Sequence, residues 1–490
     1  MAASRQVRKR QEREAQTPPK KKGSRLLVVV AYIGVAIIIL LSFVQYSGMM
    51  TRGLPAFKVG NTGYSVSNAN YFYRNAFTTF YSSYEEILGN YLDPSKPLTA
   101  QNSIFDSSKT WAEYFWEGAL SQAKQITALA DSAKAEGYSL TQEEREEVSG
   151  WLDTLKKSAE ESDYSYRNYI PLYFGNGNNE KTVRAMMEKS LLAERYHAYK
   201  RSNLQYDEAE LAQYYEENRD TFDSVAYSYV LVSGAGEESE DGGNAEAAMA
   251  EALSKAQAIT QAQGGLEGFR QAVLAYTGQQ AVSTVTAKSS IDPVLLAWLT
   301  DSAREKGDSV YLETEGGYYA LYFLESLDNH YNSVSVRHIL KKAQDADADG
   351  QLSQEELDAA REAVEEIYDT WKESGADEDT FISLVGEHSD DGGSVENGGL
   401  YENITKYQMV DAFDEFCFQP HQYGDTAIVL GSSGSYAGYH LIFFVGEGEP
   451  VWKTQAENAK RETNLSAWMD ELLEPYEVKE TFMMKFVMDY

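Results

Sequence analysis

The sequence has little cysteine and little positive charge. Its 490 residues include one cysteine, Cys417, and 43 Lys and Arg against 76 Asp and Glu, which gives a formal net charge of -33. A single cysteine excludes an internal disulfide, so stability must come from ordinary apolar cores. Cys417 itself is expected to be a buried small side chain, with an intermolecular disulfide as the alternative. So acidic a chain would be repelled by phosphate backbones and by anionic lipid surfaces, which argues against nucleic-acid binding.

Several catalytic signatures are also missing. The sequence contains no His-Glu-x-x-His and no Gly-x-x-x-x-Gly-Lys, and Gly431-Ser-Ser-Gly434 lacks the spacing of a nucleophile elbow. What is present is a hydrophobic content of 43% and an aromatic content of 12%, which excludes a disordered or collagen-like polymer. The length allows roughly three domains.

Basic residues are densest at the N-terminus, before the chain's long apolar run. Nine Lys and Arg precede residues 26–46, which carry no charge. As a helix this run would be about 31 Å long, enough to span a bilayer. We therefore predict a cytoplasmic basic tail at 1–25, a single-pass transmembrane anchor at 26–46 in the cell membrane, and an extracytoplasmic remainder. A cleaved signal peptide is the alternative, but the run is too long and no small-x-small site follows.

Residues 56–222 read as helices separated by short loops. Apolar residues recur at helical spacing from Trp111 to Ala130, and Thr141 with Glu144 forms a capping box. A further helix is expected from Tyr206 to Asn218. An aromatic stripe early in this region is expected to pack in a core, with a peptide-binding cradle as the alternative; it consists of Tyr71, Phe72, Tyr73, Phe77, Phe80, Tyr81 and Tyr84.

From residue 224 the chain contains a tandem repeat, 224–328 and 333–447. The first strand of each copy begins Ser-Val, the last strands at 317–323 and 438–444 align, and each last strand follows a Gly-Asp pair, at Gly307 and Gly424. Each copy runs strand, helix, helical middle, strand, which predicts two α+β domains with helices around a small sheet.

The second copy resembles the parvulin family of peptidyl-prolyl isomerases. The resemblance lies in five ordered blocks: Val336-Arg-His-Ile-Leu340, Phe381-Ile-Ser-Leu384 with Ser389-Asp-Asp391, Gly398-Gly-Leu400, Gln408-Met-Val-Asp-Ala-Phe413 and Gly438-Tyr-His-Leu-Ile442. The helical region resembles, more weakly, the chaperone domain of SurA- and PrsA-type foldases. That resemblance implies that a C-terminal helix at 452–476, within 448–490, completes the helical domain.

The resemblance implies a catalytic site and a substrate pocket. His338 and His440 would lie on neighbouring strands and hydrogen-bond together, with Asp391 at a position where relatives carry Cys or Asp. Leu400, Met409 and Phe413 match the proline pocket, and no cofactor is needed. This sequence departs from the family at Tyr401, where Gly is usual, and at Ala437, where a polar residue is frequent.

The first copy lacks this chemistry. The alignment of the two copies places Tyr229 opposite His338 and Tyr319 opposite His440, and the first copy is shorter in the stretch that corresponds to Asp391 and Met409. We therefore expect residues 224–328 to form a degenerate parvulin-like domain that serves as a spacer or binding surface.

A further motif is independent of the family. Residues 345–356 match the twelve-residue EF-hand calcium loop, with glycine at position 6. The alternative is a solvated acidic turn before the expected helix Glu355 to Trp371, since no helix enters the loop. The predicted calcium ligands are Asp345, Asp347, Asp349, Gln351 and Glu356.

Together these features predict a membrane-anchored foldase that isomerises X-Pro bonds in unfolded or proline-containing exported polypeptides. A holdase chaperone that does not isomerise them, and a calcium-responsive envelope scaffold, are the alternatives.

Overall fold

The computed structural model of the protein describes residues 49–88, 91–93, 95–234, 245–348, 351–433 and 436–487. The chain divides into two compact units, one of residues 1–204 with 464–490 and one of residues 205–463. The predicted tail and anchor at 1–46 lie outside the described residues. Among the helices of the described ranges, none is both long and apolar enough to cross a membrane.

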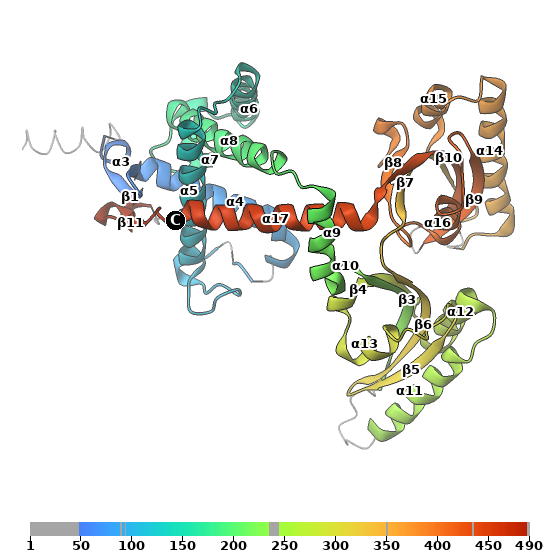
Figure 1. Cartoon of the computed structure of the whole chain (residues 1–490). Coiled ribbons are helices and arrows are strands. Elements are labelled where there is room, and N and C mark those ends of the chain that lie inside the picture. Colours follow the sequence, from blue (N-terminus) through green and yellow to red (C-terminus); the bar gives the residue numbers. More distant parts are fainter. Residues whose placement is uncertain are drawn as a thin grey trace, which may run out of the picture. The chain divides into compact units, whose positions relative to one another are not determined.

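The first unit is mainly helical (Figure 1). Three of its helices begin with capping boxes, made by Thr110, Thr141 and Asn179, whose side chains accept a backbone N–H three residues on. The helices of this unit are α3 Met49–Gly53, α4 Val66–Leu88, η1 Leu98–Ala100, α5 Trp111–Ala135, α6 Gln142–Glu161, α7 Tyr166–Phe174, α8 Glu180–Ser202 and η4 Phe482–Phe486.

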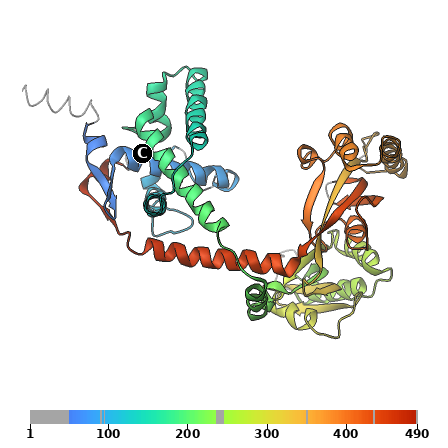
Figure 2. The same ribbon diagram turned by 45° about the horizontal axis from the view of Figure 1, so that its top comes forward.

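A small sheet, which the sequence did not predict, completes this unit. β1 Pro55–Val59 lies between β2 Thr62–Ser65 and the C-terminal β11 Val478–Glu480, all antiparallel. The end of helix α17, Val451–Leu473, also belongs here, and it packs Trp468 and Leu472 against the core around Tyr196. α17 is one continuous helix (Figure 2).

Most of the aromatic stripe of α4 packs in a core, as predicted. Tyr71, Phe72 and Tyr73 are buried in the cluster of the first unit, and Phe77 and Phe80 pack against it. The last two members of the stripe, Tyr81 and Tyr84, are 37% and 41% exposed.

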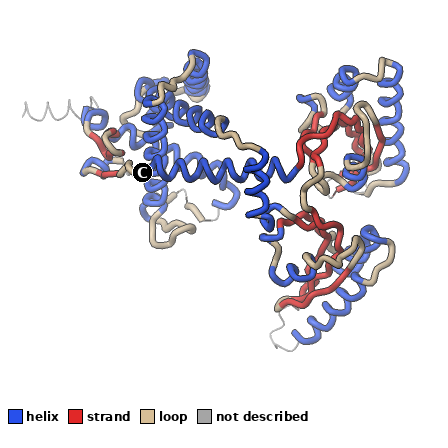
Figure 3. Tube along the Cα trace, viewed as in Figure 1, coloured by secondary structure: helices blue, strands red, loops and turns tan. Residues whose placement is uncertain are grey.

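The second unit begins earlier than the repeat. The helix expected at 206–218 forms as α9 Glu208–Glu217 and is followed by α10 Arg219–Phe222, but both belong to the second unit and not to the helical one. Each copy of the repeat is an antiparallel four-stranded sheet with helices around it, as predicted (Figure 3).

The first copy has the strand order β4-β3-β6-β5. Helix α11 covers one face of the sheet and α13 lies over the other. Its elements are β3 Ser224–Ser233, α11 Ala245–Thr260, α12 Gly265–Thr277, β4 Val282–Ala287, η2 Lys288–Ser290, α13 Pro293–Leu299, β5 Ser309–Thr314 and β6 Gly317–Leu327.

The second copy has the equivalent order β8-β7-β10-β9. Helices α14 and α15 cover one face and α16 the other. Its elements are β7 Asn332–Lys342, α14 Gln354–Glu373, α15 Glu378–His388, η3 Val395–Asn397, β8 Leu400–Ile404, α16 Asp411–Cys417, β9 Thr426–Ser433 and β10 Tyr436–Pro450. Cys417 is buried at 2% exposure, as expected for a small core side chain.

Strand register confirms the alignment of the two copies. Tyr229 pairs with Leu321 as His338 pairs with Ile442, and Tyr319 pairs with Leu231 as His440 pairs with Leu340. The two Gly-Asp pairs are also equivalent, because in each copy the glycine N–H donates to a phenylalanine of the last strand whose own N–H donates back to the aspartate carbonyl.

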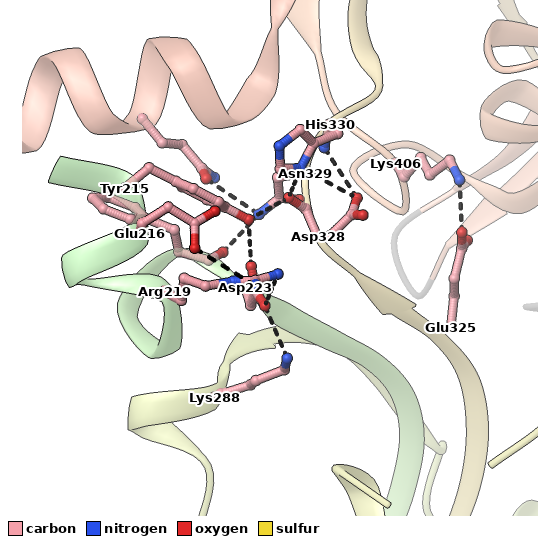
Figure 4. Close-up of polar contacts among 12 residues, drawn as sticks. Tyr215, Glu216, Arg219, Asp223, Lys288, Glu325, Asp328, Asn329, His330 and Lys406 are labelled. Atoms are coloured by element: carbon pink, nitrogen blue, oxygen red, sulfur yellow. Dashed lines mark hydrogen bonds and ion pairs between the residues drawn. The ribbon is translucent and has the colours of Figure 1, made fainter. Parts of the chain in front are cut away.

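A polar cluster joins the copies to the start of α17 (Figure 4). The hydroxyl of Tyr215, on α9, lies 2.5 Å from the carboxylate of buried Asp223 and 2.6 Å from the Asp328 carbonyl in the segment between the copies. The next residue, Asn329, donates its side-chain N–H to the Phe222 carbonyl at 2.6 Å and accepts the Trp452 backbone N–H. Lys288 also forms an ion pair with Asp223, with its Nζ 3.0 Å from the carboxylate.

Candidate active site

The two predicted histidines meet on the central strands of the second copy. His338 on β7 and His440 on β10 face the same side of the sheet, with exposures of 2% and 3%, and their Nδ1 atoms are 3.1 Å apart. Alternation along each strand places both on the face covered by α16. The antiparallel register therefore brings together two residues that are far apart in the sequence.

Asp391 lies at the other end of His338, and its Oδ2 receives three hydrogen bonds. His338 Nε2 is 2.9 Å from Asp391 Oδ2, and the hydroxyls of Ser394 and Tyr401 donate to the same oxygen at 2.5 and 3.0 Å. Burial alone would raise the pKa of Asp391, but these donors and the neighbouring imidazole outweigh it, so its pKa is lowered. The carboxylate is therefore charged at neutral pH.

Both imidazoles are neutral at neutral pH. Burial lowers the pKa of His338, and burial, with the neighbouring His338 ring adding to the effect, lowers the pKa of His440 to about 3. A neutral imidazole has one N–H. If His338 donates from Nε2 to Asp391, its Nδ1 must accept from His440 Nδ1, and His440 Nε2 must then accept the Tyr436 hydroxyl, which lies 3.0 Å away. The hydrogen bonds thus run in one direction, from Tyr436 to Asp391.

Two glycines leave room for this series of hydrogen bonds. A Cβ at Gly431 on β9 would lie 2.6 Å from His440 Nε2, and one at Gly399 would lie 2.4 Å from the His338 carbonyl. Gly399 also has a φ of +73° and accepts the His338 N–H at 2.9 Å. Side chains at either position would displace a histidine.

The residues predicted for the proline pocket do not all lie together. Phe413 is fully buried, with its ring edge-on to both histidines at 5.6 and 5.3 Å, and half-buried Met409 packs in the same cluster. Leu400 is not in that cluster. It pairs with Arg337, so its side chain takes the opposite face of β8, and Tyr401 occupies the histidine face.

Three residues of the site were missed by sequence reasoning: Ser394, Tyr401 and Tyr436. The unusual Tyr401 was a usable signal, since it stands where the family usually has glycine. Tyr436 could have been found from its spacing, because residues four apart in a strand share a face. Ser394 has no sequence signal of this kind, since a loop places it.

The acidic loop lies apart from the histidine site, between β7 and α14. It brings Asp345, Asp347 and Glu356 together, with one ligand oxygen of each within 4.8 Å of the others. Glu356 also accepts the backbone N–H groups of Ala346 and Ser353, at 2.5 and 2.8 Å, and so caps α14. Predicted ligand Asp349 lies outside the described residues.

The first copy has aromatic rings at the two histidine positions. The rings of Tyr229 and Tyr319 meet edge-on with centroids 6.0 Å apart, on the face covered by α13. This pair has no imidazole and therefore cannot form the hydrogen-bond chain of the second copy.

A four-stranded antiparallel sheet with two buried, hydrogen-bonded histidines on its central strands defines the class of parvulin-like isomerase domains. Residues 319–445 match the family model described as the PPIC-type PPIASE domain. The second copy is thus a parvulin-type peptidyl-prolyl isomerase domain, as the sequence resemblance predicted. No curated protein sequence matches the chain.

Solved structures of foldases and chaperones are similar to parts of the chain. Foldase protein PrsA from Streptococcus pneumoniae is 12% identical over 76% of this chain and 88% of that one, with a TM-score of 0.28. PrsA from Bacillus anthracis is 20% identical, but the match covers 30% of this chain and 59% of that one, with a TM-score of 0.19. One of two SurA-like chaperones of Campylobacter jejuni is 13% identical over 68% of this chain and 82% of its own, with a TM-score of 0.14.

Proposed function

We propose that the second copy isomerises X-Pro bonds in unfolded exported polypeptides and that His338, His440 and Asp391 form its catalytic centre. The observation that carries the proposal is the buried, one-directional hydrogen-bond chain that ends at the charged Asp391, beside the apolar side chains of Met409 and Phe413.

Isomerisation requires no nucleophile, because only the amide resonance must be broken, against a barrier of about 18–20 kcal/mol. We place the prolyl ring against Met409 and Phe413, where water is excluded. The planar amide has a larger charge separation than the twisted one, so loss of water favours the twisted state. The neutral histidines form a rigid wall for this rotation, and Asp391 fixes their tautomers.

The wider role we propose is that of a foldase held at the cell membrane by residues 26–46. The uncharged apolar run and the basic residues before it support the anchor. The helical unit and the first copy would then bind unfolded segments.

Turnover of a short proline peptide by the full chain, purified in detergent, tests this function. Acceleration of isomerisation above the uncatalysed rate is the expected result. If the chain instead prevents aggregation of a proline-free client without accelerating isomerisation, it is a holdase and the proposed catalytic centre is wrong.

A second candidate function, calcium binding, is favoured by the position of the acidic loop's ligands. Carboxylate and carbonyl oxygens are the ligands that Ca²⁺ prefers, and three of the five predicted residues converge. We propose that a calcium ion bound here would order the segment between β7 and α14 and would take no part in isomerisation.

A further inference from the structure

The segment between β8 and α16, residues 405–410, contacts both copies of the repeat. It carries Met409 and leads directly into α16, which carries Phe413. The position of this segment therefore determines where both apolar side chains of the proposed proline pocket lie.

Two consecutive side chains of this segment contact one glutamate of the first copy. Glu325, near the end of β6, accepts a hydrogen bond from Lys406 Nζ at 2.7 Å and another from the Tyr407 hydroxyl at 3.0 Å, one to each carboxylate oxygen (the Lys406 contact is drawn in Figure 4). Lys406 is further held by Tyr331, whose hydroxyl accepts its backbone N–H at 3.1 Å.

The backbone at Tyr407 is unusual for a residue with a large side chain. Its φ is +64°, in the left-handed region that such residues rarely adopt. This conformation costs energy unless the surroundings hold it. Tyr407 packs against the core of the first copy, and burial followed by the charge of Glu325 raises its pKa. The contact with the first copy thus offsets a strained turn next to Met409.

A second contact holds the far end of the segment. Asp411, the first residue of α16, forms an ion pair with Arg270 on α12 of the first copy, and Arg270 also donates to Ser283 Oγ at 3.1 Å. Arg270 donates from both terminal nitrogens to the carboxylate, a bidentate geometry that fixes direction as well as distance.

We propose that Glu325 is a positioning residue for the proline pocket, so that the degenerate first copy supports substrate binding in the second. The inference rests on the proposed function of the second copy. Glu325 does not touch the histidines and acts through Tyr407 and Lys406 on Met409. Its loss should weaken substrate binding more than it slows the rotation itself.

The experiment compares the full chain with Glu325→Ala, using Glu315→Ala as the matched control, because Glu315 is an exposed glutamate in the turn before the same strand. We expect Glu325→Ala to raise KM about three- to tenfold with kcat within about twofold, and Glu315→Ala to change neither. Glu325→Gln retains an oxygen that can accept the Tyr407 hydroxyl and should restore part of the loss.

Tyr407→Phe provides a second readout of the same contact. If Glu325 acts through the Tyr407 hydroxyl, Glu325→Ala should raise KM less in a Tyr407→Phe background than in the wild type. Equal KM values in wild type and Glu325→Ala, or a fall in kcat alone, would overturn the inference while leaving the isomerase function intact. A wild-type chain without turnover would instead refute the proposed function.

Discussion

At the scale of single residues, the proposed catalytic pair depends on the neutrality of both imidazoles. Protonation of either would break the one-directional chain, since a doubly protonated ring has no acceptor. Their low pKa values follow from burial, and Asp391 supplies a charge without protonating them because three donors already satisfy it.

Replacement of His440 should abolish this arrangement. In His440→Gln the amide cannot both donate to His338 Nδ1 and accept from Tyr436 in the same geometry, so kcat/KM should fall at least about tenfold, or about 1.4 kcal/mol. His388→Gln is the matched control, because His388 is exposed at the end of α15. If His440→Gln turns over the peptide at the wild-type rate, the assigned site is wrong.

Asp414 should make stability depend on pH. Burial raises its pKa to about 6, although backbone N–H groups of residues 407–409 oppose the shift, and Asp411 lies near it. Its Oδ1 has no partner among the described residues. An unfolded aspartate titrates near 3.9, so between about pH 4 and 6 the folded state binds more protons and stability falls as pH rises.

Asp414→Asn should remove this loss of stability with rising pH, which is on the order of 2 kcal/mol in the free energy of unfolding. The measurement is the difference in free energy of unfolding between variant and wild type at pH 4 and at pH 6.5. Relative to wild type, the variant should be more stable at the higher pH than at the lower. The exposed neighbour Glu415→Gln is the control, and an equal difference at both pH values would show that Asp414 has an ordinary pKa.

At the scale of elements, β-strand pairing was easier to predict than loops. The first and last strands of each copy were predictable because they carry a repeated sequence pattern. The strand register then shows that Tyr229 and Tyr319 occupy the positions equivalent to His338 and His440. Leu400 was misjudged because one residue along a strand reverses the face. The three strands beside the helical unit were missed because they are short and one of them lies more than 400 residues from its partner.

The loop between β7 and α14 gives a prediction at this scale. Calcium should bind weakly, with a dissociation constant of about 0.1–1 mM, because a strand and not a helix leads into the loop. Calorimetry on the full chain should give heat that is lost in Asp345→Asn. That variant is a cleaner test than Glu356→Gln, since Glu356 also caps α14. Glu362→Gln, exposed on the same helix, should bind as the wild type does; no heat from millimolar calcium would leave only an acidic turn.

At the scale of the whole molecule, the two copies of the repeat differ in the residues they carry. One copy retains the histidines, and the other retains the fold and contacts the pocket segment of its partner through Glu325 and Arg270. This arrangement could not be read from the sequence, because no periodicity or motif marks a contact between domains. The sequence placed the helix at 206–218 in the helical region for the same reason: Tyr215 is buried in the second unit by Phe222 and Trp452, contacts that the local sequence does not encode.

The cluster around Tyr215 should therefore couple the segment between the copies to the helices on either side of it. Tyr215→Phe removes the hydroxyl from Asp223 and Asp328, leaving a buried carboxylate with one donor fewer, at a cost of about 1–3 kcal/mol. We expect a lower transition temperature in calorimetry of the full chain, with the ring stack on Phe222 kept. Tyr276→Phe, 47% exposed on α12, is the control and should melt as the wild type does. If Tyr215→Phe melts at the wild-type temperature, the Tyr215 hydroxyl contributes nothing to the stability of the unit.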